Sequence, residues 1–294
     1  MIQRLAFIGL GVMGYPMAGH LARKGFEVVV FNRTASKSGQ WVREFGGRAA
    51  STPRDAAMGA DVVFACVGRD ADVSEVTRGT DGAFQSMQSS AIFVDHTTAS
   101  AMLARELAVA AKQAGCGFVD APVSGGEQGA KDARLTVMCG GNRSDYEKVE
   151  PVIRSYAKEC QLLGEAGAGQ LTKMVNQICI AGLVQALAEG LSFARAAGLD
   201  PETVVDVISK GAAQSWQMEN RYKTMLSDHF EHGFAVELMR KDLAICLEEG
   251  RRNGASLPVA ALVDQFYAEV ENLGGRRWDT SSLFARMERS RKGT

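Results

Sequence analysis

The sequence predicts a doubly wound α/β domain with a mostly parallel sheet, followed by an all-α domain that a long interdomain helix joins to it. In the first half, short apolar runs alternate with helical patterns, as in a parallel sheet covered by helices. Beyond a glycine-rich stretch at 164–169 only helical spacing continues. The chain of 294 residues is long enough for two such domains. We expect their boundary within 160–170, which gives domains 1–164 and 165–294.

Six apolar runs in the first half are typical of strands, and three segments have the spacing of helices. Each of these helices ends near a glycine that can adopt the left-handed cap conformation, at Gly25, Gly46 and Gly115. The expected strands are 5–8, 27–31, 61–67, 91–94, 117–119 and 135–139, and the helices are 16–24, 37–45 and 101–114.

The second half contains apolar residues at steps of three and four, which predict helices throughout. The best-defined start is at Asp200, because Pro201 follows at the first helical position and Glu202 lies near the positive helix end. The expected helices are 170–197, 201–210, 235–252 and 258–273.

Composition excludes several classes of protein. Lys plus Arg number 33 and Asp plus Glu 34, so the net charge of −1 gives no field for nucleic acid or an anionic membrane. The six cysteines form no CxxC pair, which excludes a zinc site or disulfide framework and favours a cytoplasmic location. The first apolar run is too short for a signal peptide, and the most apolar stretch, 178–191, contains Gln185 and Glu189. We therefore expect neither export nor a membrane span.

A GxGxxG turn directly follows the first expected strand and precedes a helix. Gly9 allows a tight turn, Gly11 lets a pyrophosphate approach the backbone, and Gly14 lets the helix pack against the strand. The helix start adds N–H groups and a positive dipole end. This context predicts a Rossmann domain that binds a dinucleotide, with contacts from Gly9, Leu10, Gly11, Val12, Met13 and Gly14.

The second expected strand ends in Asn32, Arg33 and Thr34, where an NAD site usually has an acid for the ribose 2′-hydroxyl. No acid is present. The planar fork of Arg33 can instead pair with a 2′-phosphate, and Asn32 and Thr34 can add hydrogen bonds. We predict that NADP(H) is preferred and that NAD(H) is possible.

Three further segments match one pattern: FVDAPVSGG at 118–126, GQLTKMVNQ at 169–177 and KDL at 241–243. Together with the glycine turn, they resemble the β-hydroxyacid dehydrogenase family over essentially the whole chain. This family includes 3-hydroxyisobutyrate dehydrogenases, tartronate semialdehyde (2-hydroxy-3-oxopropionate) reductases and glyoxylate/succinic semialdehyde reductases. The resemblance implies a Rossmann domain, a helical substrate and dimerisation domain, and an active site between them.

The resemblance makes Lys173 the catalytic residue and Asn176 its companion one helical turn along. The chemistry agrees, because an ammonium can stabilise the charge that develops on a carbonyl oxygen during hydride transfer and can donate the proton. Gln177 lies beside them, and whether it shares or replaces the role of Asn176 stays open.

Other residues take roles by the same resemblance. Ser124, Gly125 and Gly126 would bind the substrate carboxylate, in a nest of N–H groups and a hydroxyl. For Trp216, a core or interface position is at least as good an interpretation as a pocket wall. The remaining expected contacts are Cys66, Val67, Thr97, Thr98 and Lys241 to the cofactor, and Gln177, Trp216 and Asp242 to the substrate. Of the histidines, His96 lies nearest this region, but Lys173 is the better-placed proton donor.

The leading hypothesis is an NADP-preferring oxidoreductase that acts on a small β-hydroxyacid or its semialdehyde, through Lys173 as general acid/base. One alternative is an NAD-dependent 3-hydroxyisobutyrate or serine-type dehydrogenase. Another, from a different class, is a non-catalytic dinucleotide sensor or scaffold, since fold alone does not establish catalysis. Turnover of NADPH with a panel of semialdehydes separates the classes. No metal is expected, and the apolar helices of the second half are consistent with a homodimer or homotetramer.

Overall fold

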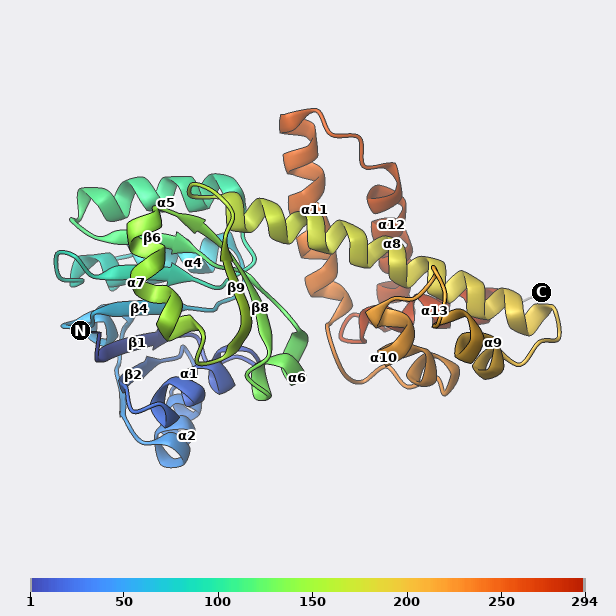
Figure 1. Ribbon diagram of the computed structural model, residues 1–294, viewed down its shortest axis with the longest axis horizontal. Helices are drawn as coiled ribbons and strands as arrows, with labels where there is room; N and C mark the ends of the chain where they lie inside the picture. The colour runs from blue at the N-terminus through green and yellow to red at the C-terminus, as the bar shows by residue number, and fades with distance from the viewer. Residues whose placement is uncertain (1, 293–294) are drawn as a thin grey trace. The chain divides into compact units, whose positions relative to one another are not determined.

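The chain forms two compact units that divide between Lys173 and Met174. The computed structural model describes residues 2–292, with side chains described as far as residue 289. Figure 1 labels most of the helices and strands. The division falls inside the long helix α8 (Ala168–Ala196). Lys173 is therefore the last residue of the first unit, although most of its helix belongs to the second.

Within residues 2–292, the first unit contains a nine-stranded sheet in the order β3-β2-β1-β4-β5-β6-β8-β7, with β9 beside β8. The six strands from β3 to β6 are parallel to one another, while β8 runs antiparallel to β6 and β7. The strands are β1 Arg4–Ile8, β2 Glu27–Phe31, β3 Arg48–Ala49, β4 Val62–Ala65, β5 Ile92–Asp95, β6 Gly117–Asp120, β7 Val123–Ser124, β8 Leu135–Gly141 and β9 Ala157–Leu162.

Helices cover both faces of this sheet, because the side chains of each strand alternate between two apolar clusters. Leu5 and Phe7 lie in the cluster formed with α1, α2, α6 and α7, whereas Ala6 and Ile8 lie in the cluster formed with α3, α4 and α5. The first group is α1 Gly14–Arg23, α2 Ala35–Phe45, α6 Gly126–Lys131 and α7 Arg143–Ile153; the second is α3 Pro53–Ala57, α4 Asp70–Arg78 and α5 Ala101–Gln113, with the short 3-10 helix η1 Ala83–Gln85.

The second unit is entirely helical in its described part and has its own apolar core. Met239 and Leu243 of α11 meet Tyr267 of α12 and Leu191 of α8 there, and all four are buried. Its elements after α8 are α9 Pro201–Ile208, α10 Trp216–Leu226, α11 Val236–Asn253, α12 Pro258–Asn272, η2 Thr280–Ser282 and α13 Leu283–Lys292.

The predicted fold class is confirmed, and so is the cap at Asp200, whose Oδ2 accepts the N–H of Thr203 at 3.1 Å. The sequence did not reveal the strands β3, β7 and β9 or the helices α3, α4, α6, α7, α10 and α13. Only Ala157 and Cys160 of β9 are buried, so this strand lacks the continuous apolar run of the central parallel strands.

By length and composition, α8 is the one helix within residues 2–292 that could cross a membrane. Half of its most apolar stretch is buried inside the protein, as in the core helix of a globular unit. Among the same residues, no group of three or more His, Cys, Asp or Glu side chains is arranged to hold a metal ion.

Candidate functional site

Most of the expected cofactor residues lie at the carboxyl ends of the parallel strands. Strands that run in one direction end at the same edge of the sheet, and β1 lies between β2 and β4, where the strand order reverses. A ligand binds in this crevice in folds of this type. The residues at this edge are Gly9 to Gly14 after β1, Asn32 to Thr34 after β2, Cys66 and Val67 after β4, and Thr97 and Thr98 after β5.

Two glycines of the turn are required by packing. Gly9 has φ +95°, and its N–H donates to the carbonyl oxygen of Phe31 at 2.8 Å. A Cβ atom at Gly9 would overlap the carbonyl oxygen of Cys66, and one at Gly14 would overlap the carbonyl oxygen of Gly9. The turn therefore brings β1, β4 and α1 closer than any side chain would permit.

The third glycine is different, because a Cβ atom at Gly11 would meet nothing within 4 Å. The neighbouring Val12 is 62% exposed, and neither a side-chain cap nor an acidic residue occupies the start of α1 at Met13. An uncapped helix start beside open backbone suits an anion such as a pyrophosphate. These residues fit the dinucleotide that the sequence predicts.

In the loop after β2, Asn32 is held by hydrogen bonds within the protein, whereas Arg33 is exposed. Asn32 Oδ1 accepts the N–H of Leu10 at 2.9 Å, and its Nδ2 donates to the carbonyl oxygen of Thr34 at 3.1 Å. Asn32 thus holds the glycine turn against the second strand. The Arg33 side chain is 91% exposed, and its Nη1 lies 3.6 Å from Asp72 Oδ1. An exposed pair of this kind contributes little stability, so the guanidinium can exchange partners at small cost.

Thr97 joins the loops after β4 and β5. Its Oγ1 accepts the N–H of Val67 at 3.0 Å, and its own N–H donates to Asp95 Oδ1 at 2.9 Å. Thr97 is buried, whereas Thr98 and Cys66 beside it are partly exposed. The hydroxyl of Thr97 therefore holds the loop after β4 against the loop after β5.

The Ser124-Gly125-Gly126 segment forms the turn into α6. Gly125 has φ +131° and Gly126 φ +64°, and a Cβ atom at Gly126 would meet nothing within 4 Å. At the other end of α6, His20 Nε2 of α1 lies 3.0 Å from the carbonyl oxygens of both Ala130 and Lys131. The predicted carboxylate-binding turn is therefore tied to the helix that starts at the dinucleotide turn.

Two buried carboxylates lie side by side at the same edge, because Asp95 ends β5 and pairs in register with Asp120 at the end of β6. Burial raises the pKa of Asp95 to about 7, although hydrogen bonds from Thr97 oppose the shift. Burial likewise raises the pKa of Asp120 to about 6, against the N–H groups that it accepts. Each carboxylate is held by backbone N–H donors despite its burial.

His96 lies in the same buried region. Its Nδ1 is 2.6 Å from the carbonyl oxygen of Ala121, and its Nε2 is 2.8 Å from the hydroxyl of Tyr156. Burial lowers the pKa of His96 to about 4, so the ring is neutral near pH 7. With both nitrogens engaged, the imidazole has a structural role at this edge.

The helix α8 carries Lys173 in the first unit and Asn176 and Gln177 in the second. Lys173 is 7% exposed. Gln177 Oε1 accepts the Nδ2 group of Asn176 at 2.8 Å, and Gln177 Nε2 donates to Asp242 Oδ2 at 2.7 Å. Lys241 Nζ lies 3.1 Å from the other carboxylate oxygen, Asp242 Oδ1. Both ends of the Gln177 amide are therefore engaged, and its Nε2 group links α8 to α11.

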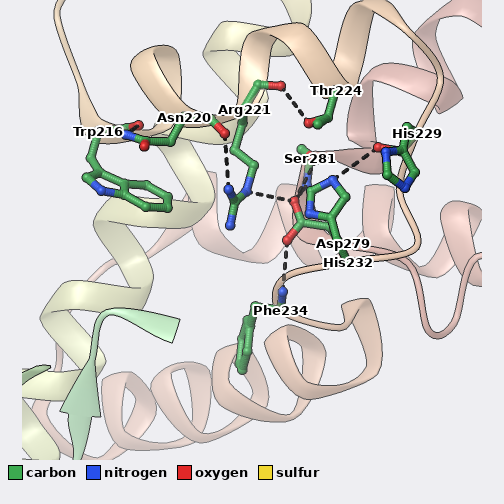
Figure 2. A network of polar contacts seen from close by, with 9 residues as sticks. All are labelled: Trp216, Asn220, Arg221, Thr224, His229, His232, Phe234, Asp279 and Ser281. Atoms are coloured by element: carbon green, nitrogen blue, oxygen red, sulfur yellow. Dashed lines mark hydrogen bonds and ion pairs between the residues drawn. The ribbon is translucent and has the colours of Figure 1, made fainter. Parts of the chain in front are cut away.

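Trp216 at the start of α10 is 53% exposed, so it is not a core residue of its unit. Figure 2 shows Arg221 between the indole ring and the carboxylate of Asp279. The guanidinium carbon lies 4.8 Å from the ring centroid, and Arg221 Nε lies 3.2 Å from Asp279 Oδ1. Asp279 is buried and also accepts the N–H of Phe234 at 2.8 Å. This network fixes the Trp216 side chain from one side.

Sequence reasoning missed the hydrogen bonds of Asp120 and Gln170 and the ion pair between Arg221 and Asp279. Asp120 and Gln170 stand inside the segments that carry the family resemblance, but their contacts join parts of the chain that are far apart in sequence. An acid at the end of an apolar strand was the one available signal for Asp120. Arg221 and Asp279 offered none.

Comparison with known proteins covers both units. Residues 4–164 match the family described as the NAD binding domain of 6-phosphogluconate dehydrogenase, and residues 167–287 match the NAD-binding domain of NADP-dependent 3-hydroxyisobutyrate dehydrogenase. The 2-hydroxy-3-oxopropionate reductase of Escherichia coli is 33% identical over 97% of this chain and 97% of its own. The chain belongs to the β-hydroxyacid dehydrogenase family. It is an NAD(P)-dependent oxidoreductase that acts on CH–OH groups.

Two further proteins resemble this chain, one in sequence and one in structure. An uncharacterized oxidoreductase of Shewanella frigidimarina is 60% identical over 99% of this chain and 100% of its own. The structure of Mycobacterium tuberculosis 3-hydroxyisobutyrate dehydrogenase with L-serine superposes with a TM-score of 0.88, at 29% identity over 97% of this chain and 99% of that one. This chain therefore has the architecture that the sequence predicts, and its cofactor is a nicotinamide dinucleotide.

The difference between Gly11 and Gly14 gives a test of the dinucleotide turn. Gly14→Ala should lower the free energy of unfolding by about 1–3 kcal/mol, because the added methyl group overlaps the Gly9 carbonyl oxygen. Gly11→Ala should leave Tm unchanged yet raise the Kd for NADPH about tenfold or more, because its methyl group would stand where the pyrophosphate approaches the backbone. Thermal melting and fluorescence titration measure the two effects. Unaltered NADPH affinity in a folded Gly11→Ala variant would contradict this placement.

The buried Asp95 gives a test of pH dependence. The pKa of Asp95 is about 7 in the folded protein, above its value in the unfolded chain. The protonated form therefore stabilises the folded protein fully below about pH 4, and this stabilisation is lost as the pH rises through 7. Asp95→Asn keeps an acceptor for the Thr97 N–H and removes the titration. Its Tm should therefore exceed that of the native protein by about 2–4 °C or more at pH 8, and by less at pH 5.

The matched control is Asp61→Asn. Partial burial would raise the pKa of Asp61, but hydrogen bonds from the N–H groups of Gln3 and Arg4 lower it overall. Its charged form therefore contributes stability at and above neutral pH, and the substitution should lower Tm at pH 8. If Asp95→Asn also lowered Tm at pH 8, the charge on Asp95 would not destabilise the folded protein.

Proposed function

We propose that this protein is an NADP-preferring oxidoreductase of small β-hydroxyacids and the corresponding semialdehydes, of the 3-hydroxyisobutyrate, tartronate semialdehyde, succinic semialdehyde or glyoxylate type. The observation that carries the proposal is the place of Lys173. This amine is buried, and it belongs to the unit whose sheet edge carries the dinucleotide turn. An amine at that position can act on the oxygen of a substrate held at the same edge.

Different residues at the sheet edge would hold different parts of the cofactor. The open backbone at Gly11 and the uncapped start of α1 would take the pyrophosphate, and Arg33 would pair with a 2′-phosphate. The loop residues Cys66, Val67, Thr97 and Thr98 would contact the rest of the cofactor, together with Lys241. When bound, the cofactor supplies or accepts the hydride at its nicotinamide ring.

Lys173 acts as the general acid in reduction and as the general base in oxidation. In reduction, its ammonium group stabilises negative charge on the carbonyl oxygen and donates a proton to it; in oxidation, the neutral amine removes that proton from the hydroxyl. Asn176 lies one turn along the helix and orients the same oxygen. Gln177 supports Asn176, since its own amide is engaged with Asn176 and Asp242.

The substrate carboxylate binds at the turn formed by Ser124, Gly125 and Gly126. Successive glycines with positive φ expose backbone N–H groups without a side chain, and the serine adds a hydroxyl. We expect Trp216 and Asp242 to contact the substrate, as the family resemblance implies, and Arg221 lies against the indole ring of Trp216. In this scheme, residues 1–164 form the NAD(P)-binding domain and 165–294 the substrate and dimerisation domain. The start of α8 up to Lys173 then belongs to the second domain in sequence but packs with the first unit.

The cofactor preference rests on the loop after β2. Its three residues include no acid that would accept from a ribose 2′-hydroxyl, and the family matched by the second unit is described by an NADP-dependent enzyme. The exposed pair between Arg33 and Asp72 can be replaced by a phosphate at small cost.

We propose a homodimer or homotetramer in the cytoplasm. The second unit exposes large apolar side chains on α8 and α12, with Phe193 at 72%, Val259 at 61% and Leu262 at 54%. Such exposed apolar side chains would be covered where subunits of a homo-oligomer meet.

Lys173→Ala should lower kcat about 10²–10⁴-fold, because it removes the proton donor, while the Kd for NADPH stays within about twofold. The measurement is NADPH oxidation with glyoxylate, succinic semialdehyde, tartronate semialdehyde and methylmalonate semialdehyde. Lys112→Ala on α5 is the control and should retain full activity. Near-normal kcat in folded Lys173→Ala would end the proposed mechanism, and tight NADPH binding without turnover of any substrate would favour the sensor.

Arg33→Ala should lower kcat/KM with NADPH about 10–100-fold and leave kcat/KM with NADH nearly unchanged, because only the 2′-phosphate loses a partner. Asp72→Ala is the matched control, since it releases the arginine without removing it, and should not lower kcat/KM with NADPH. A preference for NADH in the native enzyme that persists in Arg33→Ala would show that this position does not select the cofactor.

A further inference from the structure

The first turn of α8 is held by a buried carboxylate from the sheet. Asp120 Oδ1 accepts the N–H of Gly167 at 2.7 Å, and Asp120 Oδ2 accepts the N–H of Gln170 at 2.9 Å. The two oxygens therefore take N–H groups on both sides of the helix start, one just before Ala168 and one inside the first turn. These groups would otherwise have no partner in the helix.

Gln170 makes a second attachment, to the loop after β5. Its Oε1 accepts the N–H of Ala99 at 3.0 Å, and its Nε2 donates to the carbonyl oxygen of Thr97 at 2.7 Å. Gln170 is 1% exposed and Asp120 0%. Both polar ends of the glutamine are thus satisfied by backbone groups, which fixes its side chain in one orientation.

Glycines bring the helix start into direct contact with the strands. A Cβ atom at Gly169 would overlap the carbonyl oxygen of Met138 in β8, and one at Gly140 would lie 2.7 Å from the amide nitrogen of Gly169. The backbone of α8 therefore has no room to shift toward the sheet, and the hydrogen bonds to Asp120 oppose a shift away from it.

We propose that Asp120 and Gln170 are positioning residues for Lys173, which they hold in register with the carboxyl ends of β5 and β6. This inference rests on the proposed role of Lys173 as general acid/base. Lys173 follows Gln170 by three residues, so the two side chains lie on adjacent turns of one helix face. All of these groups belong to the first unit, which also carries the loop at Thr97 and the turn at Ser124.

The other helix starts in the chain show that a simple cap does not need this arrangement. Thr52, Ser100, Ser215 and Asp200 each cap a helix by accepting one N–H group, and Asp200 does so from the surface. At α8 the acceptor is a fully buried carboxylate whose pKa burial raises to about 6. Burial of a carboxylate costs free energy, whereas a buried serine or threonine would satisfy an N–H group at lower cost. A carboxylate explains this arrangement, because each of its two oxygens can accept an N–H group, one from Gly167 and one from Gln170.

The test combines Asp120→Asn and Gln170→Met with Lys173→Ala in double-mutant cycles. Asp120→Asn replaces one acceptor oxygen by an NH₂ group that faces an N–H donor, and Gln170→Met keeps the volume but loses both hydrogen bonds. Each single variant should lower kcat about 10–100-fold with KM and the NADPH Kd within about twofold, because a small displacement of a catalytic group mainly affects the transition state. In the Lys173→Ala background, each should lower kcat by no more than about twofold.

A second readout does not depend on activity. Amide hydrogen exchange of a peptide covering 165–173 should be faster in Asp120→Asn and Gln170→Met, while exchange in β5 and β6 stays unchanged. Asp200→Asn, which weakens the cap of α9, is the matched control and should change neither kcat nor exchange in this peptide.

The outcomes separate this inference from the function on which it rests. Loss of activity in Lys173→Ala, together with unaltered kcat in both anchor variants, would overturn the positioning role alone. An equal loss from the anchor variants with and without Lys173 would also overturn it, because the effect would then be a general one on the fold. Full activity in Lys173→Ala would overturn both proposals. Should Asp120→Asn not fold, Gln170→Met decides between these outcomes.

Discussion

Parallel strands end together, and this enzyme depends on keeping polar groups buried at that shared edge without leaving any of them unsatisfied. Asp95, Thr97 and Asp120 are almost completely inaccessible, yet each is hydrogen-bonded to backbone groups of a neighbouring loop or helix. A buried polar group without a partner would cost several kcal/mol, about 2–7 by transfer measurements. The hydrogen bonds therefore determine where each loop can run, and the loops determine where a cofactor and substrate can lie.

Much of this was predictable because local sequence determines it. The strands β1, β4, β5 and β6 are buried on both faces and β2 on one, so their apolar runs stand out from their surroundings. The turn from Gly9 to Gly14 needs glycines for steric reasons that act between near neighbours and between adjacent strands. For the same reason the cap at Asp200 could be recognised from three consecutive residues.

The remainder depends on contacts that no local pattern reveals. The sequence predicts that Asn32 contacts the cofactor, but it does not reveal that the Asn32 amide accepts the N–H of Leu10, a contact that exists only once β1 and β2 pair. The place of Gln177 depends on Asp242, which a different helix supplies. Lys173 could be identified by resemblance, but its membership of the sheet-containing unit could not, because helical spacing continues without interruption across residues 173 and 174.

The position of the division within α8 has a consequence for the construction of hybrid enzymes. A junction placed after Lys173 would leave the amine, its buried supports and the dinucleotide turn on one parental segment. The other segment would bring Gln177, Trp216 and Asp242 as a set, with the partners Arg221 and Asp279 that hold the indole ring. Under the proposed function, recombination between relatives at this point would exchange Gln177, Trp216 and Asp242 together, while Lys173 would stay with Asp120 and Gln170.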